Sequence, residues 1–272
     1  MDHSDRRSLR STRPVLPATL GEHIHHGPWT DSSLSPEEAV RHLVHRGAAD
    51  AQITGGTTVC DIGCGYGAPA RLWADEYGAS VTGFTVSQAQ HAYAQRQPGE
   101  GTTPDIRLQD FLANDLPTAS VDAAVAVESL THMADPAGSM REVARVLRPG
   151  GRFAARVWMA ASTPPDWARR HLLAPIRTEG RLSGLPTAAE VRRWADGVAL
   201  TVEQLEDVTP SVRRTWTVLR RFVQALVTDP ALLRFPLDAT EAERVFARTL
   251  SRIWLAQHLG VLRYGWVVAR RE

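Results

Sequence analysis

The sequence predicts an α/β protein built on a doubly wound, mostly parallel sheet. Short β-branched or apolar runs alternate with helical patterns throughout residues 57–158, and the first run ends in a cluster of glycines. Another run, 121–127, is continuously apolar after Asp122, as expected for a strand covered on both faces. Strands that alternate with helices build parallel sheets, because each crossover returns the chain to the same edge.

The composition is typical of a globular protein and limits the classes of molecule that it is expected to bind. The 272 residues are 43% hydrophobic and 22% charged, which argues against a disordered or fibrous protein. The formal net charge is +1 without long runs of one sign, so we expect a small-molecule partner and no nucleic acid. No apolar stretch reaches the length of a membrane span or signal peptide, which predicts a cytoplasmic protein.

The basic residues and the cysteines exclude several kinds of catalytic chemistry and of structural site. All 31 basic residues are Arg, which excludes Schiff-base chemistry, a pyridoxal phosphate anchor and a lysine-containing phosphate loop. The two cysteines, Cys60 and Cys64, follow a C-x3-C spacing that indicates neither a disulfide framework nor a zinc ribbon. We therefore expect no structural metal.

The N-terminal region predicts a tail followed by a helix. Residues 1–20 are polar, rich in Arg and interrupted by prolines, which is typical of a flexible tail. Residues 35–38 (S-P-E-E) combine a capping Ser, a Pro suited to the first helical turn and a Glu that completes a capping box. The helix should run to about Ala49.

The central region predicts a strand, a glycine turn and a helix, then further alternation. A strand over 57–62 leads through the glycines to a helix at 70–77 that Gly78 closes. The turn Pro149-Gly150-Gly151 should end the helix that precedes the fifth strand. Further strands are expected at 80–85, 106–108, 121–127 and 153–158, with helices at 87–97 and 135–147.

After Trp158 the pattern becomes mostly helical. Helical elements at 161–199 and 209–258 are separated by a strand at 200–206, and a last strand covers 262–269. We expect the helical elements to form an insertion that shapes a substrate pocket. Most tryptophans lie in this half, which fits either an apolar pocket or core packing.

The glycine cluster predicts a ligand site. Residues 59–67 read V-C-D-I-G-C-G-Y-G, so glycines stand where the backbone must turn and approach a ligand without a Cβ in the way. The third glycine comes one residue too early for the dinucleotide fingerprint, and the strand at 80–85 ends without the carboxylate that binds ribose. Asp61 suits an ammonium group better than a pyrophosphate. S-adenosylmethionine is therefore favoured over a nicotinamide dinucleotide.

These residues carry a family resemblance. Residues 59–67 resemble motif I of class I S-adenosylmethionine-dependent methyltransferases, and 146–151 resemble the turn before their fifth strand. Residues 83–90 (G-F-T-V-S-Q-A-Q) are similar to a segment of the γ-tocopherol, sterol and cyclopropane-fatty-acid methyltransferase group, and 21–29 and 128–135 resemble γ-tocopherol methyltransferase-like proteins. The resemblance implies a Rossmann-like, seven-stranded sheet in a single domain, 21–272, with an N-terminal helical lid (21–56), a cofactor-binding core (57–160) and a helical insertion after the fifth strand.

The resemblance also implies cofactor contacts. Asp61 would lie near the amino-acid portion of S-adenosylmethionine, and Thr85 and Gln90 near its adenosine and ribose. Asp110 and Phe111, after the third strand, would meet adenine. The full set comprises Asp61, Gly63, Gly65, Gly67, Thr85, Gln90, Asp110, Phe111, Val127 and Trp29.

Methyl transfer mainly needs donor and acceptor to be aligned and water to be excluded, and a base assists if the acceptor is a hydroxyl or an acidic carbon. The candidate catalytic residues are His132, His26 and Glu128. His132 follows the fourth strand, His26 lies in the lid segment, and Glu128 would lie beside the methionine portion of the cofactor. A metal site in the H-x-H-H run of the lid is not expected, because no second ligand set has the usual spacing.

The sequence therefore predicts a methyltransferase for a small, largely apolar or aromatic natural-product acceptor, with C-, O- or N-methylation left open. A lipid or isoprenoid C-methyltransferase is the alternative. A nicotinamide-dependent oxidoreductase and a non-catalytic module are alternatives from other classes. One chain does not decide whether the protein forms a homo-oligomer.

Overall fold

The computed structural model describes residues 35–97, 101–213 and 241–272. The expected tail, 1–20, and the part of the lid that contains His26 and Trp29 lie outside these ranges.

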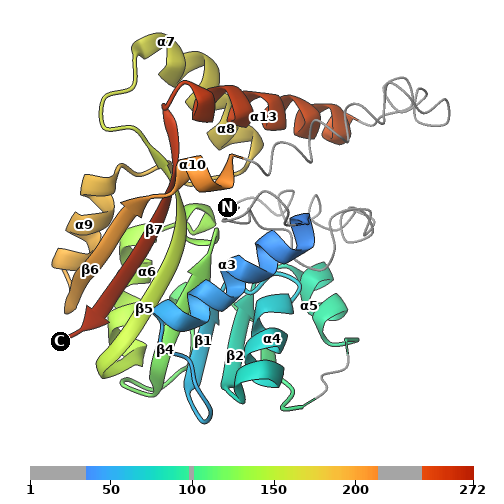
Figure 1. Cartoon of the computed structure of the whole chain (residues 1–272), viewed down its shortest axis with the longest axis vertical. Helices are drawn as coiled ribbons and strands as arrows, with labels where there is room; N and C mark the ends of the chain where they lie inside the picture. Colours follow the sequence, from blue (N-terminus) through green and yellow to red (C-terminus); the bar gives the residue numbers. More distant parts are fainter. Residues whose placement is uncertain (1–34, 98–100, 214–240) are drawn as a thin grey trace.

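The described chain forms one sheet of seven strands in the order β3-β2-β1-β4-β5-β7-β6. Neighbouring strands are parallel except at β7, which is antiparallel to both β5 and β6. The predicted doubly wound, mostly parallel sheet is confirmed (Figure 1). The strands are β1 (Thr58–Ile62), β2 (Ser80–Thr85), β3 (Asp105–Leu108), β4 (Val121–Val127), β5 (Leu147–Ala160), β6 (Leu200–Asp207) and β7 (Leu262–Arg271).

Helices and short helical turns connect the strands. The helix expected at 87–97 ends early, at Ala94, and the others in the core keep their predicted places within a few residues. The helices are α3 (Pro36–Asp50), α4 (Ala68–Tyr77), α5 (Gln88–Ala94), α6 (Pro136–Val146), α7 (Asp166–Ala168), α8 (Ala174–Glu179), α9 (Ala188–Asp196), α10 (Thr209–Val212) and α13 (Glu241–His258). The 3-10 turns are η1 (Phe111–Ala113) and η2 (Leu130–His132), and η3 (Arg169–Leu173) is a π-helical turn.

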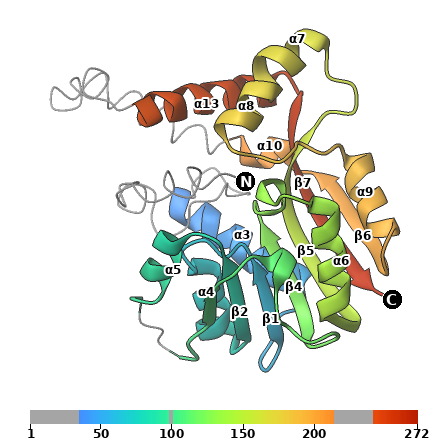
Figure 2. The same ribbon diagram turned by 180° about the vertical axis from the view of Figure 1, so that it is seen from behind.

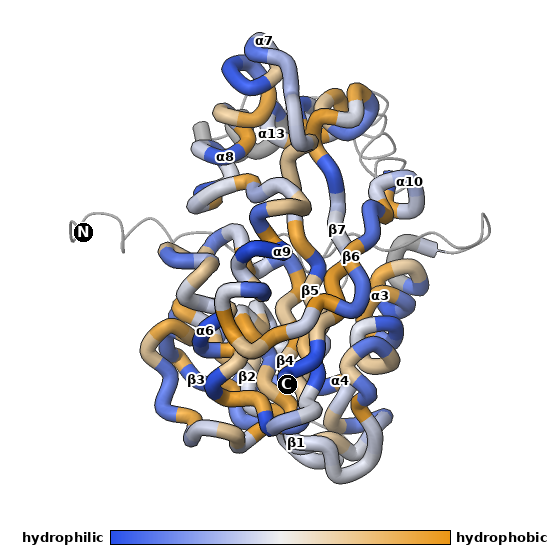
Figure 3. The backbone as a smooth tube through the Cα atoms, turned by 90° about the vertical axis from the view of Figure 1, so that its left-hand side faces the viewer, coloured by the Kyte–Doolittle hydropathy of each residue, from blue (hydrophilic) through white to orange (hydrophobic). Residues whose placement is uncertain are grey.

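Two hydrophobic clusters cover the two faces of the sheet. On β4, Ala123 and Val125 belong to the cluster beneath α3 and α4, whereas Ala124 and Ala126 belong to the cluster beneath α6 and α9. This explains the continuous apolar run, because a strand buried on both faces needs apolar residues at every position. Figure 2 shows the face that carries α6 and α9, and Figure 3 shows the apolar strands between the layers.

The helix starts follow the predicted local chemistry. The backbone N–H of Glu38 donates to Ser35 Oγ at 3.2 Å, and that of Ser35 donates to the Glu38 carboxylate at 2.7 Å, so the capping box forms. Asp135 caps α6 by accepting from the N–H of Gly138 at 2.8 Å. Gly78 closes α4 in the left-handed conformation.

The start of the fifth strand differs from the prediction. β5 begins at Leu147, which pairs with Val121, and the register then shifts so that Arg152 pairs with Ala123. The Pro-Gly-Gly segment therefore forms an irregularity within the strand instead of a loop before it. A Cβ at Gly151 would lie 2.9 Å from two carbonyl oxygens, so this close approach needs glycine.

A helical cap lies beyond the carboxyl ends of the parallel strands (Figure 1). It consists of α7, η3, α8 and α13, and Glu179 of α8 joins it by accepting from Thr249 Oγ1 at 2.7 Å and pairing with Arg252. No helix in residues 35–97, 101–213 and 241–272 is long and apolar enough to cross a membrane.

Candidate functional site

The glycine turn after β1 has the backbone that the sequence predicts. Gly63, Gly65 and Gly67 have φ angles of 72°, 56° and 76°, in the left-handed region that favours glycine. A Cβ at Gly63 would lie 2.4 Å from the Cβ of Ser129, whereas one at Gly65 would meet no atom of the described residues within 4 Å. Gly63 is therefore required by packing, and no described residue fills the space beside Gly65.

Asp61 is a buried carboxylate at the end of β1. Its exposed fraction is 2%, and its Oδ2 has no hydrogen-bond partner among the residues that the structure describes. Burial raises the pKa of Asp61 to about 7. A buried carboxylate without a partner is costly, and a cationic ligand would relieve that cost. The ammonium group of S-adenosylmethionine has the required charge, so the residues present fit this cofactor.

Two polar contacts that sequence reasoning missed support the turn. Ser129 Oγ donates to the carbonyl of Ile62 and ties the loop after β4 to β1. The buried Arg71 of α4 donates to the carbonyl of Tyr66 at 2.9 Å. No local pattern predicts either contact, because each depends on how the turn packs against its neighbours.

Thr85 and Gln90 form one unit after β2. Thr85 Oγ1 donates to Gln90 Oε1 at 2.9 Å and accepts from the N–H of Ser87 at 3.2 Å. Ser87 caps α5 by accepting from the N–H of Gln90 at 3.4 Å. The T-x-S-x-x-Q pattern therefore has a structural role, and the bond to Thr85 leaves the amide nitrogen of Gln90 to donate to a ligand.

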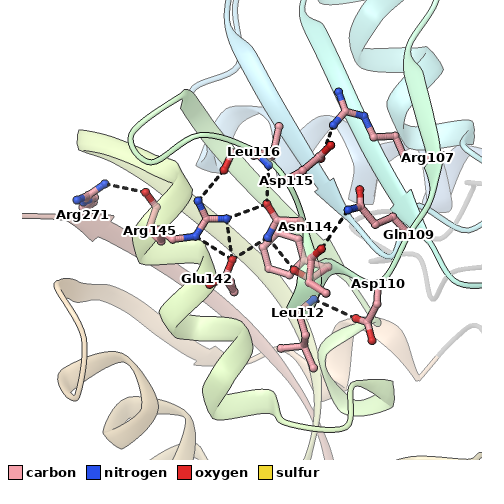
Figure 4. A network of polar contacts seen from close by, with 12 residues as sticks. Arg107, Gln109, Asp110, Leu112, Asn114, Asp115, Leu116, Glu142, Arg145 and Arg271 are labelled. Atoms are coloured by element: carbon pink, nitrogen blue, oxygen red, sulfur yellow. Dashed lines mark hydrogen bonds and ion pairs between the residues drawn. The ribbon is translucent and has the colours of Figure 1, made fainter.

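Asp110 lies on the loop after β3. It is exposed and accepts from the N–H of Leu112 at 3.0 Å. Behind it, Asn114 donates to Glu142 at 2.8 Å, and Arg145 donates to Asn114 Oδ1 at 3.0 Å (Figure 4). This network holds the loop against α6.

Phe111 is oriented differently from Asp110. Its ring is 2% exposed and packs on Phe84, with ring centroids 5.8 Å apart. Its side chain is therefore part of the core, so any cofactor contact at Phe111 must come from its backbone.

Glu128 follows Val127 at the end of β4 in a left-handed conformation, with φ 56°. Its N–H donates to the carbonyl of Arg156 at 2.9 Å, and its carboxylate accepts from Tyr264 Oη at 2.7 Å. A positive φ at a residue other than glycine is a strained arrangement that surrounding contacts must maintain. Tyr264 lies 136 residues away in the chain, so no local signal could have found this pair.

His132 ends η2 beside the buried Thr131, and part of the residue is exposed to solvent while the protein covers the rest. Partial burial lowers the pKa of His132, while a hydrogen bond to the backbone of Arg181 and the charge of Glu128 act in the opposite direction. His132 is therefore neutral near pH 7 and can accept a proton.

The structure brings these residues to one edge of the sheet. The turns after adjacent strands are joined by backbone bonds, from Cys64 N–H to the carbonyl of Phe84 at 2.9 Å and from Gln109 N–H to that of Thr85 at 3.0 Å. The predicted residues His26 and Trp29 lie outside the described residues. Within the described ranges, no group of three or more His, Cys, Asp or Glu side chains could hold a metal ion.

The tryptophans of the second half divide between core and surface. Trp158 and Trp266 are buried in the cluster beneath α3, whereas Trp167 and Trp254 are about half exposed, at 50% and 43%. Core packing therefore accounts for the first two.

Sequence comparison identifies related proteins. A family described as a methyltransferase domain matches residues 60–155. The 27-O-demethylrifamycin SV methyltransferase of Amycolatopsis mediterranei is 33% identical over 210 residues, 75% of each chain. The O-methyltransferase resE of Aspergillus sclerotiorum is 37% identical and covers 73% of this chain and 76% of its own. The cycloartenol-C-24-methyltransferase of Arabidopsis thaliana is 34% identical over 54% of this chain and 44% of its own.

Solved structures share the fold over almost the whole chain. The [4+2]-cyclase SpnF is 26% identical, has a TM-score of 0.74, and the match covers 95% of this chain and 91% of the cyclase. The mycolic acid cyclopropane synthase CmaA1, solved with S-adenosylhomocysteine, is 18% identical with a TM-score of 0.81. The match covers 98% of this chain and 94% of the synthase. These matches, the glycine turn and the orphaned Asp61 carboxylate favour S-adenosylmethionine over a nicotinamide. The chain belongs to the S-adenosylmethionine-dependent methyltransferases.

Proposed function

We propose that the protein transfers the methyl group of S-adenosylmethionine to a hydroxyl oxygen of a small, largely apolar or aromatic natural product. One observation carries this choice of acceptor: relatives named for O-methylation match about three quarters of the chain. The 210-residue match is longer than the 57–160 core, so it includes part of the region expected to shape the acceptor pocket.

The cofactor is held by the turns after β1 to β4. Asp61 receives the ammonium group, Gly65 lets the backbone approach, and Gln90 and Asp110 supply polar contacts to the ribose and adenine. When bound, S-adenosylmethionine supplies a methyl group activated by its sulfonium. The chain itself must hold donor and acceptor in line, and such alignment can contribute about 7 to 11 kcal/mol to catalysis.

His132 is the proposed base. It takes the proton of the acceptor hydroxyl while the oxygen–methyl bond forms and the sulfur–methyl bond breaks, so the products are an ether and S-adenosylhomocysteine. The lowered pKa of His132 keeps it neutral before the reaction. The Glu128 carboxylate then stabilises the imidazolium. A positioned base contributes roughly 10²- to 10⁴-fold in rate.

The helical cap supplies the walls of the acceptor pocket in this proposal. Elements at 161–199 and 209–258 include α7, α8, α10 and α13, which lie beyond the carboxyl ends of the parallel strands (Figure 1). Closing a site in this way excludes water from the reacting atoms. The cytoplasmic location and any homo-oligomer stay predictions.

Carbon methylation of a lipid or isoprenoid is the second candidate. Its support is the similarity to a cycloartenol C-methyltransferase, which is confined to 54% of this chain. A base near the sulfonium would serve that reaction as well, because carbon methylation also ends in proton loss. The two proposals differ in the atom that receives the label.

The test is an assay with methyl-labelled S-adenosylmethionine and a panel of hydroxylated aromatic and macrocyclic compounds, alongside a sterol and a prenylated quinol. Mass spectrometry detects the label, and carbon NMR distinguishes a methoxy from a C-methyl signal. We expect methoxy products whose formation falls about 10²-fold or more in His132→Gln. A label found only on carbon, or undiminished turnover in His132→Gln, contradicts the proposal.

A further inference from the structure

A short loop between α8 and α9 is bound tightly to the turn that carries His132. The N–H and Oγ of Ser183 both donate to the carbonyl of Thr131, at 2.7 and 3.0 Å. Thr131 is 2% exposed and is the immediate neighbour of His132. Because both donors converge on one buried carbonyl, the loop and η2 must hold a fixed relative position.

The same loop contacts the His132 ring through a backbone atom. The ring forms a hydrogen bond with the backbone of Arg181, and this bond favours the protonated ring. A backbone group that favours the imidazolium is an acceptor, so the partner is the carbonyl oxygen of Arg181.

Arg181 has an unusual backbone conformation. Its φ is 53°, in the left-handed region that residues other than glycine rarely adopt. The N–H of Arg181 donates to the carbonyl of Thr178 at 3.2 Å, and the N–H of Leu182 donates to that of Arg177 at 2.8 Å, so backbone bonds hold Arg181 and the residue after it. A strained backbone maintained in this way next to a candidate base suggests a functional role.

A carbonyl accepts hydrogen bonds only, which decides the tautomer of the ring. The nitrogen bonded to Arg181 must carry the hydrogen, and the other nitrogen of the neutral ring then has a free lone pair. We propose that Arg181 is a positioning residue whose main-chain carbonyl holds His132 in the one tautomer that can accept the proton of the acceptor. This inference rests on the proposed role of His132 as the base.

Three influences act on the His132 ring. The Glu128 carboxylate follows β4, the Arg181 carbonyl comes from the loop before α9, and the protein around η2 desolvates the ring. Loss of the carbonyl would leave the desolvation and Glu128 unchanged. The pKa of His132 should then fall further, and the ring should lose its preference for one tautomer.

The test compares two substitutions that remove the same side chain. Arg181→Gly retains easy access to the left-handed region, whereas Arg181→Val disfavours it, because a β-branched residue at positive φ is strained. The ring nitrogen signals of His132 are followed by NMR in ¹⁵N-histidine-labelled protein, and His132→Gln identifies them by their absence. The acid limb of kcat/KM is measured in parallel for the natural acceptor class found in the labelling assay.

We expect Arg181→Gly to keep the wild-type tautomer and His132 pKa. In Arg181→Val the ring should populate both tautomers, its pKa should fall by about 0.7 pH unit, and the plateau of kcat should fall. Ser183→Ala, which loosens the loop without altering residue 181, should shift the same signals in the same direction. A merely structural role would lower the melting temperature without moving the acid limb.

Equal tautomer populations and equal pKa values in the wild type, Arg181→Val and Ser183→Ala would overturn the inference. If Arg181→Val does not fold, the tautomer populations and the pKa of His132 in Ser183→Ala are compared with the wild type, and equal values overturn the inference. The NMR readout does not depend on turnover. Full activity of His132→Gln would refute the role of His132 as the base, whereas a ring that takes up either tautomer freely would refute the role of Arg181.

Discussion

At the scale of single residues, Asp61 is a buried carboxyl group whose negative charge no cation of the described chain neutralises. Its carboxylate is buried, its Oδ2 has no hydrogen-bond partner in the described part of the chain, and the turn that follows contains no basic residue. The folded chain alone therefore favours the protonated form, while an ammonium ligand requires the charged form. Cofactor binding and the ionisation of Asp61 should be coupled.

Asp61→Asn tests this coupling through pH. Burial raises the pKa of Asp61 to about 7, above its ordinary value of 3.8, so the stability that protonation gives the wild type is complete below about pH 4 and is lost as the pH rises to 7. At pH 8 we expect the cofactor-free Asn variant to have a higher melting temperature than the wild type. At pH 5 this difference in melting temperature should be smaller or reversed. The rise in melting temperature caused by S-adenosylhomocysteine should be larger in the wild type at pH 8. An equal rise in both proteins would show that Asp61 does not meet the ammonium group.

Tyr264→Phe tests the contact that holds Glu128. The substitution removes the hydroxyl that donates to Glu128 at 2.7 Å, and a hydrogen bond to a charged group contributes about 1.5–3 kcal/mol. We expect kcat/KM to fall about tenfold or more. The matched control is Tyr77→Phe, which removes a hydroxyl bonded to His45 at 2.9 Å, on the helix pair α3–α4. Similar losses in both variants would mean that Glu128 needs no fixed orientation.

At the scale of elements, the turn between β1 and α4 combines two demands on its glycines. Gly63 lacks room for a side chain, while Gly65 has room but a backbone conformation that only glycine adopts easily. The turn is therefore specified partly by packing against Ser129 and partly by the space that it leaves for a ligand.

Gly65→Ala separates backbone strain from ligand contact when it is paired with Gly56→Ala. Both glycines have positive φ, 56° for Gly65 and 81° for Gly56, and within residues 35–97, 101–213 and 241–272 no atom would lie within 4 Å of a Cβ at either. Gly56, however, precedes β1 at the opposite edge of the sheet. Both variants should lose a similar amount of stability, of the order of 1 kcal/mol, in urea unfolding. Only Gly65→Ala should lower the affinity for S-adenosylhomocysteine, by about tenfold or more in calorimetry. Equal affinities would place the cofactor away from Gly65.

At the scale of the whole molecule, a buried ion pair joins α3 to the sheet. Arg156 of β5 is 1% exposed, donates to Asp50 of α3 at 2.9 Å, and lies 3.5 Å from the ring centroid of Trp266 on β7. Burial lowers the pKa of Arg156 to about 10, so it stays charged at pH 7. Trp266 Nε1 also donates to Asp50. The three residues therefore fix α3, and with it the start of the described chain, against the sheet.

Arg156→Ala should destabilise the fold by about 3 kcal/mol or more, because it removes the buried cation that faces the Asp50 carboxylate. The other cation paired with Asp50 is Arg46, at 2.8 Å, whose side chain is exposed. The free energy of unfolding in urea measures the loss. Arg141→Ala is the control, since its pair with Asp135 is exposed, at 61% and 52%, and should contribute at most about 1 kcal/mol. A loss for Arg156→Ala as small as that of the control would show that Arg46 and Trp266 suffice to hold Asp50.

The predictions from sequence succeeded where a few neighbouring residues decide the structure. The capping box at Ser35 and the glycine that closes α4 follow from local hydrogen bonding and backbone freedom, and both are confirmed. The predicted end of α5 and the predicted start of β5 were wrong by several residues. For β5 the reason is that pairing with β4, and not the local Pro-Gly-Gly signal, decides where the strand begins.

The sequence by itself determined the alternation of strands and helices, the glycine turn with Asp61, and the residues that resemble a methyltransferase. Only the tertiary structure decided that β7 lies antiparallel between β5 and β6, that Tyr264 contacts Glu128, and that the loop at Arg181 and Ser183 holds the turn of His132. The physical reason is the sequence separation of the residues in contact. Caps and turns depend on residues a few positions apart, whereas the Ser183–Thr131 and Tyr264–Glu128 contacts join residues 52 and 136 positions apart, which meet only when the sheet has formed.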